Sequence, residues 1–307
     1  MGWIAVIVFM FLAGLGAIGA VAAIAVYNSL TVGLDDPNLL THYALQQESV
    51  IYDRTGAVEL ARFGNAKREI VTFDEIPKVL LDATTAVEDK TFWDNAGFDP
   101  VAIVSAALGS LRGDNRGAST ITQQLVRARL LDPALVQDPS RTAERKLKEI
   151  IQSIRVTEAF PGETGKQAII TAYLNQNYYG NQSYGVKAAV DGYFGIDISK
   201  IDPAQAAVIA GLPKSPSNYD LVRNAIEQCT TSVAEGDPCP ESQLVVPADT
   251  NVVQRRNLIL ELLAAGRTPM SGAQYTSAEF KSAESEPVVL SSQVTARWIA
   301  QIGRAHV

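Results

Sequence analysis

A polar segment has carboxylates on both sides, and the carboxylate that follows it lies in a basic stretch. This order of residue types suggests chemistry. Glu88 and Asp89 precede the polar stretch Gly117 to Gln124, which reads Gly-Ala-Ser-Thr-Ile-Thr-Gln-Gln, and Arg145-Lys146-x-x-Glu149 follows it. A carboxylate can act as a general acid or base, and guanidinium and ammonium groups bind phosphate. The set therefore predicts acid/base chemistry on an anionic substrate.

The region from Arg112 to Lys148 is basic, although the whole chain is acidic. It holds eight Lys or Arg and four Asp or Glu, so eight minus four leaves a local excess of four positive charges, whereas the whole chain has a formal net charge of −7. That overall charge argues against general nucleic-acid binding. A solvated helix face explains part of the local excess, and a phosphate-binding patch explains its position beside the motifs.

The elements that must position these residues are mostly helices. Asp99-Pro100, Asp138-Pro139 and Asp202-Pro203 each predict an N-cap followed by proline at the first helical position. In the helix expected after Pro139, Arg145 and Glu149 are four residues apart and share a face.

The remaining patterns predict little β structure. A short hairpin is expected over 50–63, a loop-like insertion over 229–250 and a further helix over about 251–265. The fold class is therefore mainly α with a small β-hairpin element, which excludes a Rossmann-type alternation of strands and helices.

The first thirty-four residues carry no charged side chain, and residues 3–27 are almost wholly apolar. About 20 apolar residues can span a bilayer as one helix. A cleaved signal peptide is the alternative, but it would have a shorter apolar core after a basic start. A retained transmembrane helix is the prediction, and the absence of Lys and Arg from its flanks leaves its orientation open.

The chain has two cysteines, Cys229 and Cys239, in a stretch rich in Gly, Pro, Ser and Thr. In an exported domain such a pair can form a disulfide across a surface loop, and two unrelated thiols are the alternative. The chain has no C-x-x-C motif and only two His. We therefore expect no His/Cys zinc site and no fixed metal.

Five motifs in a fixed order carry a resemblance to a known family. They are Glu88-Asp89-x-x-Phe92 with Gly97 and Asp99; Gly117 to Gln124; Arg145-Lys146-x-x-Glu149; Lys166 with Tyr173-Leu174-Asn175 and Gly180; and Ala210-Gly-Leu-Pro-Lys-Ser-Pro216. Over about residues 45–225 the chain resembles the peptidoglycan glycosyltransferase domain (family 51) of class A penicillin-binding proteins and monofunctional transglycosylases.

The resemblance implies a lysozyme-like glycosyltransferase domain on the outer face of the bacterial cytoplasmic membrane, preceded by one transmembrane helix. The expected organisation is an anchor over 1–30, a connector over 31–47, the glycosyltransferase domain over 48–228, and a linker region over 229–307. That linker would lead to a transpeptidase domain, whose Ser-x-x-Lys and Lys-Thr/Ser-Gly motifs the chain lacks. The apolar stretch 101–131 is either ordinary core or, as in the family, partly a jaw that dips into the bilayer.

The resemblance also implies a reaction, in which lipid II is polymerised into β-1,4 glycan strands and undecaprenyl diphosphate is released. Glu88 would be the general base on the acceptor hydroxyl, and Glu149 would position the donor or a basic side chain. The pyrophosphate would be held by four cations, Arg127, Arg141, Arg145 and Lys146. Other predicted substrate-binding residues are Asp89, Phe92, Ser119, Thr120, Gln123 and Gln124. No cofactor is required, and Mg²⁺ or Mn²⁺ could bridge the pyrophosphate.

Simpler interpretations stand beside these roles. Ser119 could only cap a helix, Gln123 and Gln124 could be helix surface, and Glu149 could only pair with Arg145. The family usually has His at the position of Asn95 and Lys at that of Arg127. Because Asn cannot titrate, we expect the position of Asn95 to have a structural role.

Two rival functions remain, a lysozyme-like peptidoglycan-cleaving enzyme and a catalytically decayed cell-wall scaffold. The expected partners are lipid II, the growing lipid-linked glycan, the bilayer and cell-wall synthesis proteins. Moenomycin is the expected inhibitor, and no nucleic acid is expected.

Overall fold

The computed structural model describes residues 21, 24–42, 45, 49–63, 67–110, 119–231, 239 and 241–294. Most of the predicted anchor lies outside these residues, and so do Gly117 and Ala118 of the polar motif. Within the described ranges no helix is both long and apolar enough to cross a bilayer. The transmembrane anchor therefore stays a prediction.

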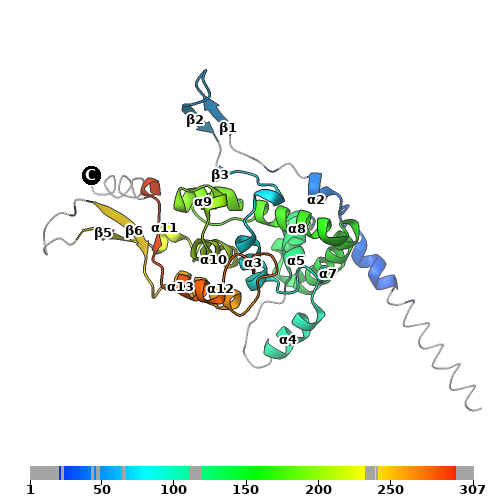
Figure 1. Cartoon of the computed structure of the whole chain (residues 1–307). Coiled ribbons are helices and arrows are strands. Elements are labelled where there is room, and N and C mark those ends of the chain that lie inside the picture. The colour runs from blue at the N-terminus through cyan, green and yellow to red at the C-terminus, as the bar shows by residue number, and fades with distance from the viewer. Residues whose placement is uncertain are drawn as a thin grey trace, which may run out of the picture.

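Helices make up most of the described chain, as the sequence predicts (Figure 1). They are α2 (Leu39–His42), α3 (Lys78–Glu88), α4 (Pro100–Ser110), α5 (Ile121–Arg129), α6 (Pro133–Gln137), α7 (Thr142–Ala159), α8 (Gly162–Gln176), α9 (Val186–Phe194), α10 (Pro203–Gly211), α11 (Leu221–Asn224), α12 (Asn251–Ala264) and α13 (Ser277–Ala283). Short 3₁₀ turns lie at Phe73–Glu75, Pro139–Arg141, Ile198–Lys200 and Leu212–Lys214.

The three predicted Asp-Pro caps are confirmed. Asp99 accepts a hydrogen bond from the Ala102 N–H at 2.8 Å, and Asp202 from the Gln205 N–H at 2.7 Å. Asp138 caps the 3₁₀ turn Pro139–Arg141, so the long helix α7 begins only at Thr142. These starts follow local chemistry, because a carboxylate satisfies an N–H that the first turn leaves free.

The strands of the described residues form three small sheets. The predicted hairpin is present as antiparallel β1 (Ser49–Tyr52) and β2 (Glu59–Phe63), and β3 (Lys67–Arg68) pairs in parallel with β4 (Ser183–Tyr184). The third sheet joins β5 (Ile226–Cys229), β6 (Ser242–Val246) and β7 (Val288–Val289) in antiparallel order.

The loop expected over 229–250 is wrong in part, because β6 lies within it. Leu244 and Val246 of this strand are buried, and this short alternation was not recognised as a strand. The Cys229–Cys239 disulfide is present, with its Cα atoms 5.7 Å apart, and it joins the end of β5 to the segment that leads into β6.

One apolar core extends through the described body. Helix α5 packs against α7 and α8, and α3 packs against α10 and α12. The core includes Leu80 of α3, Leu125 of α5, Leu260 of α12 and Phe280 of α13. In the described residues 241–294, the segment that we expected to be a linker forms strands β6 and β7 and helices α12 and α13, and it contributes side chains to the core.

The apolar stretch 101–131 divides into two parts. Ile121, Leu125 and Leu130 are buried in the core. The apolar side chains Val101, Val104 and Leu108 of α4 are exposed, and Figure 1 shows α4 at the edge of the helical body. The apolar side chains of α4 therefore lie partly at the surface, whereas those from Ile121 onward belong to the core.

The packing of α12 predicts that replacing either of two leucines in this helix with alanine has very different effects on the free energy of unfolding. Leu260 is 0% exposed and Leu258 is 45% exposed. Replacing a buried leucine with alanine typically costs about 2–5 kcal/mol, so Leu260→Ala should lower the unfolding free energy by about 3 kcal/mol and Leu258→Ala by less than about 1 kcal/mol. Urea unfolding in detergent measures both. Equal, small effects would mean that α12 is not part of the core.

Candidate functional site

Glu88 is the last residue of α3, and two other helices hold its carboxylate. Gln124 of α5 donates from Nε2 to Oε2 at 2.9 Å, and Arg255 of α12 donates from Nη2 to Oε1 at 3.0 Å. The Tyr173 hydroxyl contacts Gln124 Oε1 at 3.3 Å, which fixes the orientation of that amide. The Glu88 side chain is 12% exposed, so its carboxylate is positioned yet still reachable.

The loop after Glu88 closes on the buried carboxylate of Asp89. Asn95 Nδ2 donates to both oxygens at 3.0 and 3.1 Å, and the Ile121 N–H donates at 3.1 Å. Burial raises the pKa of Asp89, while these hydrogen bonds oppose the shift. Asp89 therefore ties the end of α3 to the start of α5, and Asn95 supplies the donor for it.

Lys166 of α8 also holds the loop that follows Glu88. It is buried, and its ammonium donates to Asn95 O at 2.6 Å and to Asn95 Oδ1 at 3.1 Å. Burial lowers its pKa, and the charge of Asp89 acts in the opposite direction. The ammonium also lies 4.8 Å from the ring centroid of Phe92, which is fully buried.

A glycine lets this loop lie against the backbone of α7 and also contact the start of α5. Gly97 has φ +90°, and a Cβ there would lie 2.3 Å from Ser153 O. The Gly97 carbonyl accepts a hydrogen bond from Thr120 Oγ1 at 2.7 Å. Thr120 and Gln123 form a reciprocal cap of α5, in which each side chain accepts from the other's N–H, at 3.2 and 3.1 Å.

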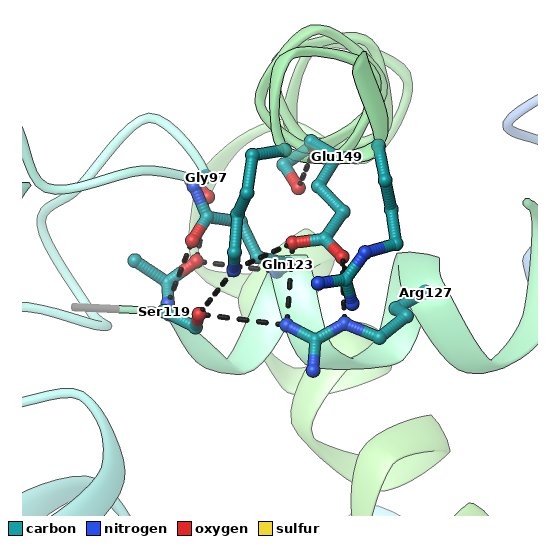
Figure 2. Close-up of polar contacts among 9 residues, drawn as sticks. Gly97, Ser119, Gln123, Arg127 and Glu149 are labelled. Carbon is teal, nitrogen blue, oxygen red and sulfur yellow. Dashed lines mark hydrogen bonds and ion pairs between the residues drawn. The ribbon is translucent and has the colours of Figure 1, made fainter. Parts of the chain in front are cut away.

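Three residues that we expected at the substrate have little exposed surface. Phe92, Thr120 and Gln123 are all buried. Phe92 packs in the core, and Gln123 is occupied by the cap (Figure 2). Thr120 also lines the cavity described below.

The second predicted carboxylate, Glu149, lies at the centre of a basic cluster (Figure 2). It is 0% exposed, and three cations reach it: Arg127 Nε at 2.6 Å, Lys146 Nζ at 2.8 Å and Arg145 Nη1 at 3.4 Å. Burial alone would raise the pKa of Glu149, but hydrogen bonds from Arg127 and Lys146 outweigh it and hold the pKa below its usual value. Three positive charges against one negative leave this basic cluster at +2.

Ser119 joins the basic cluster through its hydroxyl. Its Oγ accepts from Lys146 Nζ at 2.8 Å and from Arg127 Nη2 at 3.5 Å. Arg141, the remaining predicted cation, is exposed and pairs with Glu144 at 2.8 Å. Arg141 lies just before the first residue of α7, and among the described residues its ion pair is with Glu144 and not with Glu149.

A cavity of about 270 Å³ lies between Glu88 and Ser119. Its lining includes Glu88, Lys90, Asp99, Ser119 and Arg267. The carboxylate at the end of α3 and the serine of the basic cluster therefore face one space. In the part of the chain that the structure describes, no group of three or more His, Cys, Asp or Glu is placed to hold a metal.

Two arginines at this site were not predicted. Arg255 and Arg267 come from the segment that we expected to be a linker, and they reach Glu88 and the carbonyl of Ala86. The signal for Arg255 was the adjacent pair Arg255-Arg256 within the predicted helix over about 251–265. Arg256 is buried and donates to the carbonyls of Glu284 and Glu286.

Comparison with known proteins adds an independent finding. A family model described as Transglycosylase matches residues 56–235. The chain is 40% identical over 189 residues to penicillin-binding protein 1A of Aquifex aeolicus, covering 61% of this chain and 24% of that protein. It is 37% identical over 213 residues to penicillin-binding protein 1A/1B of Bacillus subtilis, covering 68% and 22%.

A third similar protein, penicillin-binding protein 1A of Vibrio cholerae, is 30% identical over 295 residues, covering 94% of this chain and 31% of that protein. The chain thus spans between 22% and 31% of the length of these three relatives.

The basic cluster predicts a pH-dependent stability. Glu149→Gln leaves three cations without their buried carboxylate and should cost about 3 kcal/mol at neutral pH. Because the folded pKa of Glu149 lies below the usual 4.5, this difference should be complete above that value and shrink as the pH falls through the folded pKa. Denaturant unfolding of wild type and variant between neutral and acidic pH measures it.

The control for this prediction is Glu144→Gln, which removes a carboxylate of the same helix whose side chain is 34% exposed, whereas Glu149 is 0% exposed. It should change stability little. A Glu149→Gln variant as stable as wild type at neutral pH would contradict the role of this carboxylate.

Proposed function

This chain belongs to the Transglycosylase family, and on that premise we propose that it is a peptidoglycan glycosyltransferase that polymerises lipid II. The products would be β-1,4 glycan strands and undecaprenyl diphosphate. One observation carries the proposal: a single cavity is lined by Glu88 and by Ser119, whose hydroxyl accepts hydrogen bonds from two cations of the basic cluster.

Glu88 acts as the general base. A sugar hydroxyl is a weak nucleophile at neutral pH, so a carboxylate must take its proton as it attacks. Gln124 and Arg255 hold the two oxygens of Glu88, one donor each, and an ionised carboxylate has further acceptor sites for a hydroxyl. These contacts position the base in the way that efficient proton transfer requires.

The basic cluster stabilises the leaving group. A lipid pyrophosphate leaves as an anion, so it requires fixed positive charge more than a proton. Arg127, Arg145 and Lys146 supply that charge, and Glu149 keeps them together. The basic cluster, with Glu149 included, has a net charge of +2, which complements a diphosphate. Mg²⁺ or Mn²⁺ could assist, but the step does not require a metal.

The basic cluster also favours polymerisation over the lysozyme-like alternative. Cleavage of a neutral glycosidic bond releases no pyrophosphate and would leave the cluster without a substrate group to bind. The decayed-scaffold alternative conflicts with the ordered contacts around Glu88, since they hold a carboxylate that a scaffold would not use.

The same proposal places the protein at the outer face of the cytoplasmic membrane. Exposed Val101, Val104 and Leu108 give α4 an apolar surface suited to the bilayer interface. The apolar N-terminal stretch would supply a single-pass anchor. Lipid II, the growing glycan and cell-wall synthesis proteins would be its partners there, with moenomycin as an inhibitor.

Glu88→Gln tests the assignment of the base. The amide keeps the shape of the side chain but cannot take the proton, so polymerisation should fall by about 10²–10⁴-fold. The measurement is the rate of glycan formation from labelled lipid II, together with the thermal midpoint of the folded protein. Glu158→Gln, at an exposed position of α7, is the control and should keep wild-type activity. Wild-type activity in Glu88→Gln would refute the role of Glu88.

Membrane contact by α4 can be tested with an environment-sensitive dye. A cysteine introduced at Val104 can be labelled selectively because Cys229 and Cys239 are joined in a disulfide. In protein reconstituted into vesicles, the dye at position 104 should emit at shorter wavelength than the free dye does in water. The same dye on Leu258→Cys, another exposed position, should not shift. Equal emission at both sites would argue against insertion of α4.

A further inference from the structure

The loop that follows α12 runs back to the helix that carries Glu88. Helix α12 ends where Gly266 takes φ +90°, its N–H bonding to Leu263 O at 3.0 Å, and the Arg267 N–H bonds to Leu262 O at 3.2 Å. This pair of bonds is a helix-ending motif that satisfies the last carbonyls of the helix. The backbone of Arg267 is therefore fixed by the end of α12.

The other side of Arg267 is anchored on α3. Asp82 is fully buried, and its carboxylate accepts from the Met270 N–H at 3.1 Å, the Ser271 N–H at 2.7 Å and Ser271 Oγ at 2.6 Å. A buried carboxylate requires such donors, so these contacts hold the loop in one place. The backbone is therefore fixed at Arg267 by α12 and again three to four residues later, at Met270 and Ser271, by α3.

This loop holds the Arg267 guanidinium at the last turn of α3, the helix that ends at Glu88. Its Nη1 donates to Ala86 O at 3.0 Å, a carbonyl in the last turn of α3. A cation is favoured there because the C-terminal end of a helix carries partial negative charge. A guanidinium has five N–H donors, and Arg267 is exposed and lines the same cavity as Glu88, Lys90 and Ser119.

We infer that Arg267 binds an oxyanion of the acceptor substrate while Glu88 takes the proton from its hydroxyl. This inference rests on the proposed function. An inverting transfer brings the acceptor in from the side opposite the leaving group. Because the basic cluster at Ser119 takes the leaving pyrophosphate, the cation that a different segment supplies to the cavity is free to hold the acceptor.

Guanidinium recognises phosphate and carboxylate alike, through two parallel hydrogen bonds. The acceptor lipid II offers both groups, in its lipid pyrophosphate and in the carboxylates of its peptide stem. Arg267 is thereby a binding and specificity residue for the acceptor, beyond its contact with α3.

The test uses the full chain in detergent with a saturating, labelled lipid-linked glycan as donor and lipid II at varied concentration as acceptor. Extension of the labelled chain gives kcat and the acceptor KM separately. Arg267→Gln should raise the acceptor KM about tenfold, the loss expected for one hydrogen bond to a charged group, and leave kcat unchanged. Arg267→Lys should recover part of the loss, because it restores the charge without the planar fork.

The matched control is Arg223→Gln, which removes an exposed arginine of α11 and should leave both constants at their wild-type values. Acceptors with amidated stem carboxylates identify the bound group. If Arg267 binds a stem carboxylate, amidation should raise the wild-type KM and leave that of Arg267→Gln unchanged. If Arg267 binds the pyrophosphate, amidation should leave the ratio of the two KM values unchanged.

A wild-type acceptor KM in Arg267→Gln would overturn the inference. A fall in kcat and thermal midpoint at unchanged KM would overturn it too, because Arg267 would then only cap α3. If the wild-type chain forms no polymer at all, the proposed function fails and this inference fails with it. Failure of the proposed function, seen as no polymer from the wild-type chain, is therefore distinguishable from failure of this inference, seen as an unchanged acceptor KM in Arg267→Gln.

Discussion

The site depends above all on the burial of one carboxylate among three cations. Glu149 is 0% exposed, and its charge would be costly there without Arg127, Arg145 and Lys146. With them it joins α7 to α5 and keeps side chains of like charge in one place. Arg127 and Lys146 then reach Ser119, at the wall of the cavity that Glu88 also lines. The excess charge that remains is what an anionic leaving group needs.

The carboxylate at the other side of the cavity is held by distant parts of the chain. Helix α3 is fixed to the C-terminal segment by Asp82, by the Ala86 carbonyl and by Glu88 itself. Glu88 is therefore positioned by residues up to Ser271, although the family match ends at residue 235. Helices α12 and α13 belong to the same packing unit as the motifs, and we expect the activity to require them.

The sequence predicts well what depends on neighbouring residues. The caps at Asp99 and Asp202 and the hairpin over 50–63 follow from local hydrogen bonding and alternation, and the structure confirms them. Contacts between residues far apart in the sequence do not follow from local patterns: Arg255 binds Glu88, which lies 167 positions earlier in the chain. The family resemblance named the motif residues, but only packing shows that Phe92 and Gln123 are buried as supports. The strand β6 was missed because its alternation spans only five residues.

The measurement that tests the central claim most directly is incubation of the purified chain in detergent with labelled lipid II, with and without moenomycin, followed by separation of the products on a gel. The account predicts a ladder of glycan chains that moenomycin abolishes and lysozyme digests, together with release of undecaprenyl diphosphate. No polymer from folded protein, with cleavage of preformed glycan instead, would contradict it.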